Sequence, residues 1–321
     1  MQRLRKYREN EEIRERYAEV KVVSEDLIYP YFVVDGKDQK QEIKSLHGVF
    51  RFSTDELLKD IEETQRLGIR DILLFGVVEE SLKDEIGTAA WNDNNLISKV
   101  VREIKKYFPG ITIFTDVCLC GYTSHGHCGI LNGHITDNDA TLPYLGKMAL
   151  QHALAGADFV APSAMMDGQV EAIRGQLTKH KLNTKILSYS AKYSSGFYDP
   201  FRDAANSAPS FGDRKTYQMD YRTITQATEE VKSDIEEGAD WVMVKPAHTY
   251  LDIIQRIKQQ FKDKTLAAYQ VSGEYMMIKI AAEAGLLTEE KAMHEALTAI
   301  KRAGADKIIT YYAKDFVKKG L

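Results

Sequence analysis

The chain has 321 residues, 44% of them hydrophobic, a length and composition that suit one large globular core. A net charge of −4 and an isoelectric point near 6.1 give no electrostatic reason to expect nucleic-acid or membrane partners. No apolar segment of a secretory signal follows the basic amino terminus, and no apolar run is long enough to span a bilayer. The composition therefore predicts a cytoplasmic globular protein, either an enzyme or a scaffold.

The first 22 residues form an arm dominated by Arg, Lys and Glu, with few apolar positions. This arm is helix-prone but too polar to bury a face against its own chain. Two hypotheses remain open for it: a solvated tail, or a segment that packs on a neighbouring subunit. We expect an N-terminal arm over residues 1–22 and a single main domain over residues 23–321.

After the arm, short apolar strand patterns alternate with amphipathic helix patterns. The strand patterns are not interrupted by alternating polar residues, as expected for strands covered on both faces. Eight such strands with intervening helices predict an α/β fold, a (β/α)₈ TIM barrel. An open doubly wound sheet is the alternative, but no G-x-G-x-x-G motif follows the first strand. The predicted strands are Leu27–Val33, Asp71–Val77, Ile111–Leu119, Asp158–Ser163, Lys185–Ser190, Trp241–Lys245, Leu266–Ser272 and Lys307–Tyr312.

Helix boundaries are also marked in the sequence. Ser53 followed by Glu56 before an apolar run predicts a capping box at the start of a helix. The range Asp252–Phe261 carries a single apolar stripe that is typical of a helix packed on a sheet. Before four of the strands, glycine stands where a helix ends, and it permits the left-handed helix cap. These glycines are Gly68, Gly156, Gly238 and Gly304.

All three cysteines lie within eleven residues around the end of the third predicted strand. Asp116, Cys118 and Cys120 alternate along that strand, so their side chains share one face, and the next loop returns Cys128. Three thiolates leave a tetrahedral zinc ion with an open fourth position, which is typical of a catalytic site. We expect neither histidine of this loop to bind the metal directly. Ordinary buried cysteines are the alternative interpretation.

Two lysines lie at the ends of neighbouring predicted strands, Lys192 after the fifth and Lys245 at the end of the sixth. Burial and a second nearby lysine both lower the pKa of an amine, and the neutral amine is the form that attacks a ketone. Lys245 follows apolar residues, whereas Lys192 lies among serines. We therefore expect Lys192 to be better solvated and Lys245 to react first. A structural ion pair is the alternative for either lysine alone.

The segment after Lys192, residues 193–220, is too long for a simple barrel connection and is rich in Gly, Pro, Tyr and Phe. It carries Arg202 and Arg214, and arginine binds carboxylates through two parallel hydrogen bonds. We interpret this range as a lid segment over the site rather than a disordered excursion. Ser272 and Tyr311, which follow the last two strand cores, offer hydroxyls to a substrate carboxylate.

From about Leu27 to its C-terminus, the chain resembles the porphobilinogen synthase (5-aminolaevulinate dehydratase) family. The resemblance implies a lyase of tetrapyrrole and haem biosynthesis that condenses two 5-aminolaevulinate molecules to porphobilinogen with loss of two waters. It also implies a homo-octamer or a related high-order homo-oligomer. The motifs that carry it are TDVCLCGYTSHGHCG, SYSAKY, FYDPFRDAANSAPSFGDRKTYQ, MVKPAHTYLDI, YQVSGEY and KRAGADKIITYYA.

The resemblance implies a role for each matching residue. Lys245 forms the Schiff base with the substrate that becomes the propionyl side, and Lys192 serves the second substrate. The three cysteines hold the catalytic zinc, and Glu230 matches a glutamate that binds an allosteric magnesium ion in some bacterial members. The residues expected to contact substrate are Arg202, Arg214 and Gln218 at the second site, Ser272 and Tyr311 at the first substrate's carboxylate, Tyr198, Phe201 and Tyr269 in the pocket wall, and Asp116.

Two other functions remain open from the sequence. A class I aldolase is also a barrel with a Schiff-base lysine, but it needs neither three clustered cysteines nor two strand-end lysines. A barrel scaffold with a structural zinc would not turn over substrate, yet a structural zinc site normally closes four ligands. Detection of the pyrrole product with an aldehyde reagent separates all three hypotheses.

Overall fold

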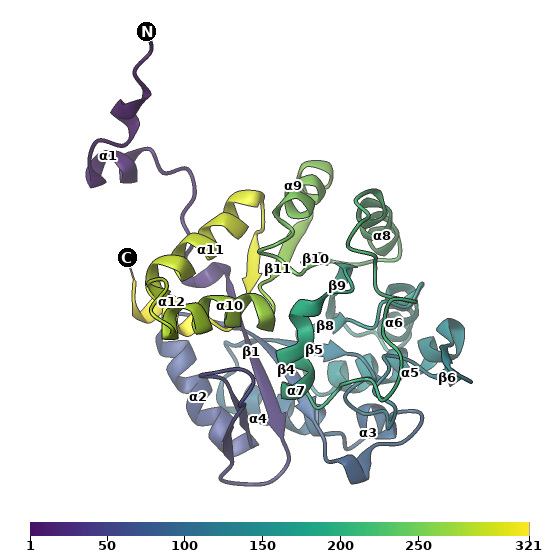
Figure 1. The fold of residues 1–321 in the computed structure, drawn as a ribbon. Coiled ribbons are helices and arrows are strands. Elements are labelled where there is room, and N and C mark those ends of the chain that lie inside the picture. Colours follow the sequence, from purple (N-terminus) through teal and green to yellow (C-terminus); the bar gives the residue numbers. More distant parts are fainter. Residues whose placement is uncertain (321) are drawn as a thin grey trace.

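The computed structural model describes residues 1–320, in which eight parallel strands form a closed barrel (Figure 1). The barrel closes because the last strand, β12 (Lys307–Ile309), pairs with the first, β1 (Leu27–Val34). The predicted TIM barrel is confirmed. The strands between them, in order around the barrel, are β4 (Asp71–Val77), β5 (Thr112–Val117), β8 (Phe159–Pro162), β9 (Lys185–Lys192), β10 (Trp241–Lys245) and β11 (Thr265–Tyr269).

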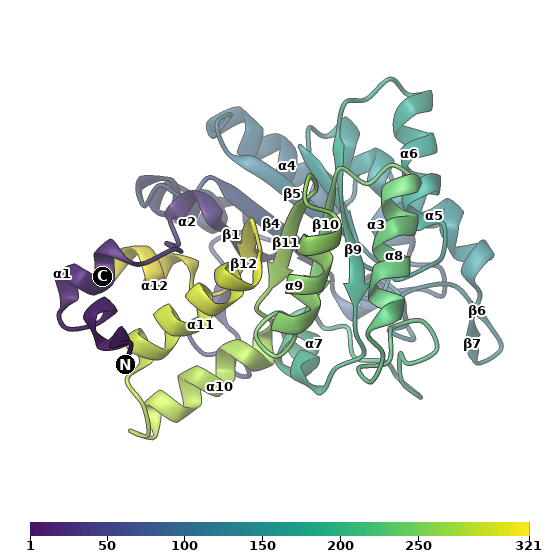
Figure 2. The same ribbon diagram turned by 90° about the horizontal axis from the view of Figure 1, so that it is seen from above.

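Helices surround the barrel and connect its strands (Figures 1 and 2). They are needed because parallel neighbours can be joined only by a crossover connection. In α9 (Leu251–Gln260) the buried side chains are Ile253, Ile254 and Ile257, which confirms the predicted apolar stripe. The other helices between barrel strands include α2 (Thr54–Arg66), α4 (Leu96–Tyr107), α5 (Asn138–Leu154), α6 (Gln169–Lys179), α8 (Thr225–Glu236), α10 (Ser272–Glu283) and α11 (Glu289–Ala303).

Smaller elements extend the sheet or lie in the loops. The strand β3 (Phe50–Phe52) pairs with β1 and with β2 (Lys40–Glu42), and β6 (Leu131–Asn132) forms a separate hairpin with β7 (Ile135–Thr136). No helix within residues 1–320 is long and apolar enough to cross a membrane. The short helices are η1 (Leu4–Tyr7), α1 (Glu11–Arg16), η2 (Ser24–Asp26), η3 (Glu80–Leu82), α3 (Thr88–Trp91), η4 (Gly196–Tyr198), α7 (Asp199–Ala204) and α12 (Ala313–Lys318).

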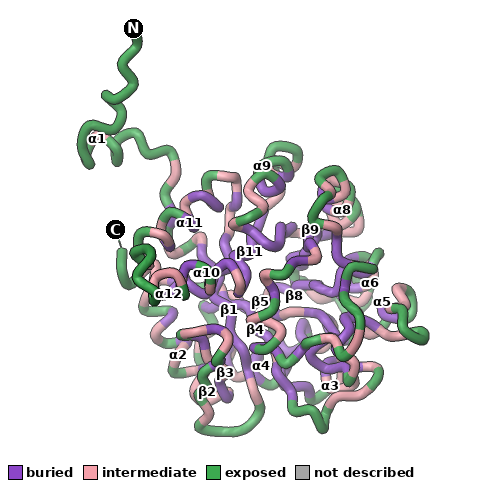
Figure 3. Tube along the Cα trace, in the orientation of Figure 1, coloured by how far each residue is buried: buried purple, intermediate pink, exposed green. Residues whose placement is uncertain are grey.

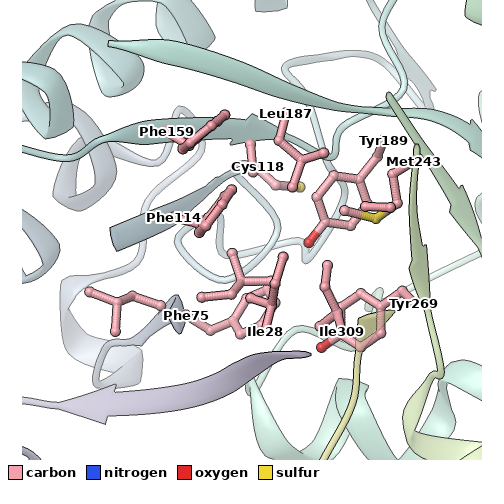
Figure 4. Close-up of a cluster of buried hydrophobic side chains, with 14 of the residues drawn as sticks. Ile28, Phe75, Phe114, Cys118, Phe159, Leu187, Tyr189, Met243, Tyr269 and Ile309 are labelled. Carbon is pink, nitrogen blue, oxygen red and sulfur yellow. The ribbon is translucent and has the colours of Figure 1, made fainter. Parts of the chain in front are cut away.

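The barrel interior is a packed core rather than a channel (Figure 4). Phe114 of β5 stacks on Phe159 of β8 with ring centroids 4.3 Å apart, and both rings are buried. Figure 4 shows Tyr189 and Tyr269 in the same cluster, with Cys118 nearby. The core therefore continues directly into the residues on which the predicted chemistry depends.

Several strands end at positions that differ from the predicted ones. β5 ends at Val117, so Cys118 and Cys120 lie in the loop beyond it rather than on the strand. β11 ends at Tyr269 because Ser272 already begins α10, and β9 continues to Lys192. The apolar pattern alone could not place these ends, because they depend on where a neighbouring strand stops offering backbone hydrogen bonds.

The predicted capping box at the start of α2 is wrong. Ser53 is the N-cap, but its hydroxyl donates to Asp55 Oδ1 (2.6 Å) and accepts from the backbone N–H of Gln39 (2.9 Å). Glu56 instead pairs with Lys59. The Ser53 hydroxyl was expected to bond to the first turn of α2, but it bonds to Gln39, just before β2, and to the side chain of Asp55. The glycine caps are confirmed by positive φ angles at Gly68 (81°), Gly156 (105°), Gly238 (107°) and Gly304 (120°).

The N-terminal arm lies away from the barrel (Figure 1) and is exposed along almost its whole length (Figure 3). Within it, α1 begins after Asn10, whose side chain accepts a hydrogen bond from the N–H of Ile13 (2.9 Å). Tyr7 and Tyr17 pack edge to face with ring centroids 4.8 Å apart. The first buried residue along the chain is Val22.

Candidate active site

The two predicted reactive lysines lie side by side at the C-terminal ends of adjacent strands. Lys245 of β10 is the register partner of Lys192 of β9. Lys245 is 4% exposed and Lys192 is 6% exposed, so both are buried and the expected difference in their solvation is small. The amine of Lys192 donates to the backbone carbonyl of Ser163 (2.5 Å), and this contact takes the place of water.

Aromatic rings surround the amine of Lys245. Its Nζ lies 4.3 Å from the ring centroid of Tyr269 and 5.0 Å from that of Phe201. Tyr189 and Tyr198 complete the enclosure at 5.1 and 5.2 Å. Burial, and next the positive charge of Lys192, lowers the pKa of Lys245 to about 7. A large fraction of this amine is therefore neutral near pH 7, the form that attacks a ketone.

Asp116, near the end of β5, interacts electrostatically with both lysines. Burial raises its pKa to about 6, opposed by a hydrogen bond from Ser163 and by the charges of Lys192 and Lys245. Its Oδ1 is buried without a hydrogen-bond partner among the described residues. The carboxyl group thus has one oxygen free for a ligand.

The three cysteines converge as predicted. All are buried, and their sulfur atoms lie within 4.8 Å of one another, with Cys118 and Cys120 Sγ 3.3 Å apart. Hydrogen bonding to the two other sulfurs raises the pKa of Cys118 well above its usual range, and the same kind of contact holds the pKa of Cys128 well below it. Sulfurs bound to one tetrahedral zinc at about 2.3 Å are about 3.8 Å apart, so small shifts would suit the ion.

The cluster offers three ligands and leaves one position open. Within residues 1–320, no His, Asp or Glu joins the three sulfurs as a fourth ligand. His127 Nε2 donates to the carbonyl of Phe211 (3.1 Å), and its Nδ1 lies 3.2 Å from the hydroxyl of Tyr217. His125 Nε2 lies 3.2 Å from the carbonyl of Glu85. The ring nitrogens of both histidines thus have partners other than the sulfur cluster.

The lid segment, residues 193–220, covers the end of the barrel at which the strands finish. Figure 2 shows α7 of this segment at the end toward which the β9 arrow points. Arg214 is buried and donates to the carbonyls of Gly126 (2.9 Å) and Ser207 (2.5 Å). Arg202 pairs with Asp199 of the same helix (2.8 Å). The segment is therefore attached to the loop that carries Cys128.

Three residues predicted for the second substrate carry polar atoms without partners. The Nε atoms of Arg202 and Arg214 are buried and unpaired within the described chain. The amide nitrogen and oxygen of the Gln218 side chain are also buried and unpaired. Buried polar atoms are rarely left unpaired, so their presence here indicates a place for a polar ligand.

The two residues predicted to bind the carboxylate of the first substrate, Ser272 and Tyr311, contact aromatic residues that lie around Lys245. Ser272 Oγ accepts a hydrogen bond from the N–H of Phe201 (2.9 Å). The hydroxyls of Tyr311 and Tyr269 are 3.1 Å apart. The hydroxyl of Tyr198 donates to the backbone carbonyl of Lys245 (3.2 Å). These side chains come from β11, from the start of α10, from the residues after β12 and from the lid segment, and only the fold brings them together.

Two residues of the site were not predicted. Ser163 accepts the hydrogen bond of the Lys192 amine, and the ring of Tyr189 lies 5.6 Å from Lys192 Nζ and 5.1 Å from Lys245 Nζ. A signal existed for each. Ser163, whose backbone carbonyl makes this contact, directly follows a barrel strand, and Tyr189 precedes Lys192 by three residues in the SYSAKY motif.

Glu230 lies apart from this site, on helix α8. It lines a small cavity of about 100 Å³ with Asp167, Asp234 and Glu237. Burial raises the pKa of Glu230 above its usual value. The structure therefore does not bring Glu230 to the lysines or the cysteines.

Comparison with known proteins gives the family. The family model described as delta-aminolevulinic acid dehydratase matches residues 1–319. The chain belongs to the delta-aminolevulinic acid dehydratase family. The Bacillus subtilis (strain 168) enzyme is 47% identical over 317 residues, covering 98% of this chain and 97% of that one. The Methanothermus sociabilis enzyme is 49% identical over 318 residues, covering 99% and 98%.

A solved structure shows the same fold throughout. The Toxoplasma gondii ME49 enzyme, in complex with its reaction product porphobilinogen, superposes with a TM-score of 0.97 at 41% identity. The match covers 99% of this chain and 91% of that chain. The predicted family and the lyase class are confirmed. Membership in this family decides against the class I aldolase and the structural scaffold.

Proposed function

We propose that this enzyme condenses two molecules of 5-aminolaevulinate to porphobilinogen with loss of two waters, and that Lys245 makes the first covalent bond. The observation that carries the proposal is the register pairing of two buried lysines, Lys245 and Lys192, beside a cluster of three cysteines. A class I aldolase would need one of these lysines and none of the cysteines. Family membership supports the same reaction.

The first substrate binds around Lys245 in this proposal. The neutral amine attacks the ketone carbon, a Schiff base forms, and the ketone oxygen leaves as water. Tyr198, Phe201 and Tyr269 exclude bulk water from the amine, as their close packing around Nζ indicates. The hydroxyls of Ser272 and Tyr311 bind the carboxylate of this substrate.

The second substrate binds beside Lys192, under the lid segment. The unpaired N–H groups of Arg202, Arg214 and Gln218 would donate hydrogen bonds to its carboxylate. Asp116 has an unpaired oxygen and a pKa of about 6, so it can accept or release a proton close to both amines. Its proposed role is to contact the substrate and transfer protons during ring formation.

Cys118, Cys120 and Cys128 would hold a zinc ion. Three convergent sulfurs with no fourth side-chain ligand among residues 1–320 fit a catalytic zinc better than a structural one. When bound, zinc supplies a Lewis acid that polarises an oxygen or nitrogen ligand. A reducing compartment keeps thiols free, so we place the enzyme in the cytoplasm.

A magnesium site at Glu230 is the second metal proposal. The cavity lined by Glu230, Asp167, Asp234 and Glu237 provides the oxygen ligands that Mg²⁺ prefers. These carboxylates do not form a convergent ligand set among the described residues, so water would complete the coordination. The proposed role is allosteric, because neither lysine and none of the cysteines lines the cavity.

We propose a homo-octamer or a related homo-oligomer, with residues 1–22 as an arm that packs on a neighbouring barrel. In the isolated chain the arm exposes Leu4, Tyr7 and Tyr17, each by more than a third. A subunit contact would remove these apolar groups from water.

The decisive test is turnover. Purified enzyme with zinc and 5-aminolaevulinate should yield a pyrrole that gives a coloured product with an acidic aldehyde reagent. Borohydride reduction during turnover should trap a covalent adduct on a lysine. Absence of pyrrole with a folded, zinc-loaded enzyme would refute the proposed function, and an adduct without pyrrole would favour an aldolase-type reaction.

A further inference from the structure

Glu274, on the first turn of α10, is a buried carboxylate with no cationic partner. It is 0% exposed, and within residues 1–320 no Lys, Arg or His side chain forms an ion pair with it. Removing a carboxylate from water is costly unless other groups replace its hydration. The contacts that replace water at Glu274 therefore indicate what the residue does.

Four hydrogen bonds replace water, and they come from two separate segments. Oε1 accepts from the backbone N–H of Thr249 (2.8 Å) and from its hydroxyl (3.0 Å). Oε2 accepts from the N–H of Val271 (3.0 Å) and from the N–H of Ala247 (3.3 Å). One carboxylate thus joins the loop after β10 to the start of α10.

Helix capping explains only one of these bonds. A glutamate at the third position of a helix commonly accepts from the N-cap N–H, here that of Val271. The bonds from Ala247 and Thr249 come from the loop that follows the neighbouring strand, and a helix cap does not require them. Ala247 is two residues after Lys245, and Val271 directly precedes Ser272.

The two residues before Glu274 connect the same helix to the lid segment. Ser272 Oγ accepts from the N–H of Phe201 (2.9 Å) and lies 3.3 Å from the carbonyl of Phe197, to which it can donate. A Cβ at Gly273 would lie 2.7 Å from backbone atoms of Phe197, so only glycine fits this approach. Three consecutive residues therefore meet the lid segment on one side and the Lys245 loop on the other.

We propose that Glu274 is a positioning residue that sets the separation between the Lys245 amine and the Ser272 hydroxyl. This inference rests on the proposed function, in which these two groups hold the ketone and the carboxylate of one substrate molecule. That molecule has a flexible chain, so a fixed spacing between the two groups lowers the entropic cost of holding both of its ends at once. Glu274 itself touches no substrate.

The test compares two ketones that differ only in the carboxylate. Levulinate carries a ketone and a carboxylate, whereas 2-butanone carries the ketone alone. Borohydride reduction followed by peptide mass mapping measures the rate at which each labels Lys245 in the zinc-loaded enzyme. In the wild type, levulinate should label faster, because it gains the Ser272 contact.

The variant Glu274→Gln keeps the shape but faces backbone donors with an NH₂ group. It should slow levulinate labelling by about tenfold and leave butanone labelling within about twofold, because only the spacing to Ser272 changes. Glu274→Asp, which keeps the charge, should recover part of the loss. Glu56→Gln, at the third position of α2, is the matched control and should change neither rate, because Glu56 bridges no strand ends.

The remaining outcomes also decide the matter. If folded Glu274→Gln labels Lys245 more slowly with both ketones to the same degree, or is slowed with neither, the positioning role is overturned. If Glu274→Gln does not fold, Thr249→Val removes one donor to the same carboxylate and should slow levulinate selectively, though less. If Thr249→Val leaves both rates unchanged, the inference is wrong. A wild type that labels at Lys245 with neither ketone would instead refute the proposed function.

Discussion

Lys245 of β10 and Lys192 of β9 are register partners at the rim of the barrel, and each is less than a tenth exposed. Their difference lies in their contacts rather than in their exposure. Lys192 donates to the carbonyl of Ser163, whereas Lys245 is enclosed by four aromatic rings. This asymmetry assigns them different steps in the proposed reaction.

The first prediction concerns the order in which the two lysines react. Borohydride reduction with 5-aminolaevulinate should place the adduct mainly on the peptide that contains Lys245, because its amine is enclosed and partly neutral. Lys245→Ala should abolish the adduct and lower turnover by roughly 10³-fold or more. Lys192→Ala should still form the adduct but fail to complete the ring. Exclusive labelling of Lys192 in the wild type would contradict this order.

The second prediction is a pH dependence of Schiff-base formation. The pKa of Lys245 is lowered to about 7, so its amine is mostly protonated at pH 6 and mostly neutral at pH 8. The labelling rate should therefore rise as pH increases through about 7. Lys192→Met removes one of the causes of the lowering, so the rise should move to higher pH. A rate that is constant from pH 6 to 8 would argue against a titrating Lys245.

The third prediction separates catalysis from folding at the cysteine cluster. Chelation should abolish turnover, and re-addition of zinc should restore it. Far-UV circular dichroism and the thermal unfolding midpoint should be nearly unchanged, because Cys118, Cys120 and Cys128 lie in loops beyond the end of β5. Unfolding on chelation would show that the metal is structural.

The fourth prediction concerns the arm. An enzyme that starts at Val23 lacks the exposed segment, and it should form smaller assemblies than the full chain, as measured by light scattering. The physical reason is that Leu4, Tyr7 and Tyr17 find no place on their own barrel. If the assembly differs only by the mass of the removed residues, the arm is a solvated tail.

The fifth prediction concerns the contact between α10 and the lid segment. Gly273→Ala would place a methyl group 2.7 Å from the backbone of Phe197, so the lid segment must move. We expect kcat to fall by about tenfold or more and limited proteolysis within residues 193–220 to accelerate. Gly196→Ala is the matched control, because a Cβ at Gly196 meets no atom within 4 Å. Equal effects of the two substitutions would show that the close approach at Gly273 does not matter.

Much of the fold was predictable because its signals are local. Runs of apolar residues identified all eight barrel strands, and glycine identified four helix ends. The gathering of the two lysines and the three cysteines at one end of the barrel was also predictable, because they stand at or just after strand ends, and the ends of parallel barrel strands meet there. The family resemblance added Tyr198, Ser272 and Tyr311, and the structure places them in hydrogen-bond contact with Lys245 or with residues that lie around it.

Other features depend on contacts between distant parts of the chain, and only the tertiary structure decided them. Its serine neighbours suggested that Lys192 is solvated, but the fold turns its amine toward Ser163, 29 residues away. The hydroxyl of Ser53 does not cap α2 in the expected way, because it bonds to Gln39 and Asp55 instead. Glu274 appears in the sequence as an ordinary helix-start glutamate, and its bonds to Ala247 and Thr249 exist because β10 and β11 are neighbours. Local sequence sets backbone preference and burial, whereas the partner of a buried polar group is set by which strands the closed barrel places side by side.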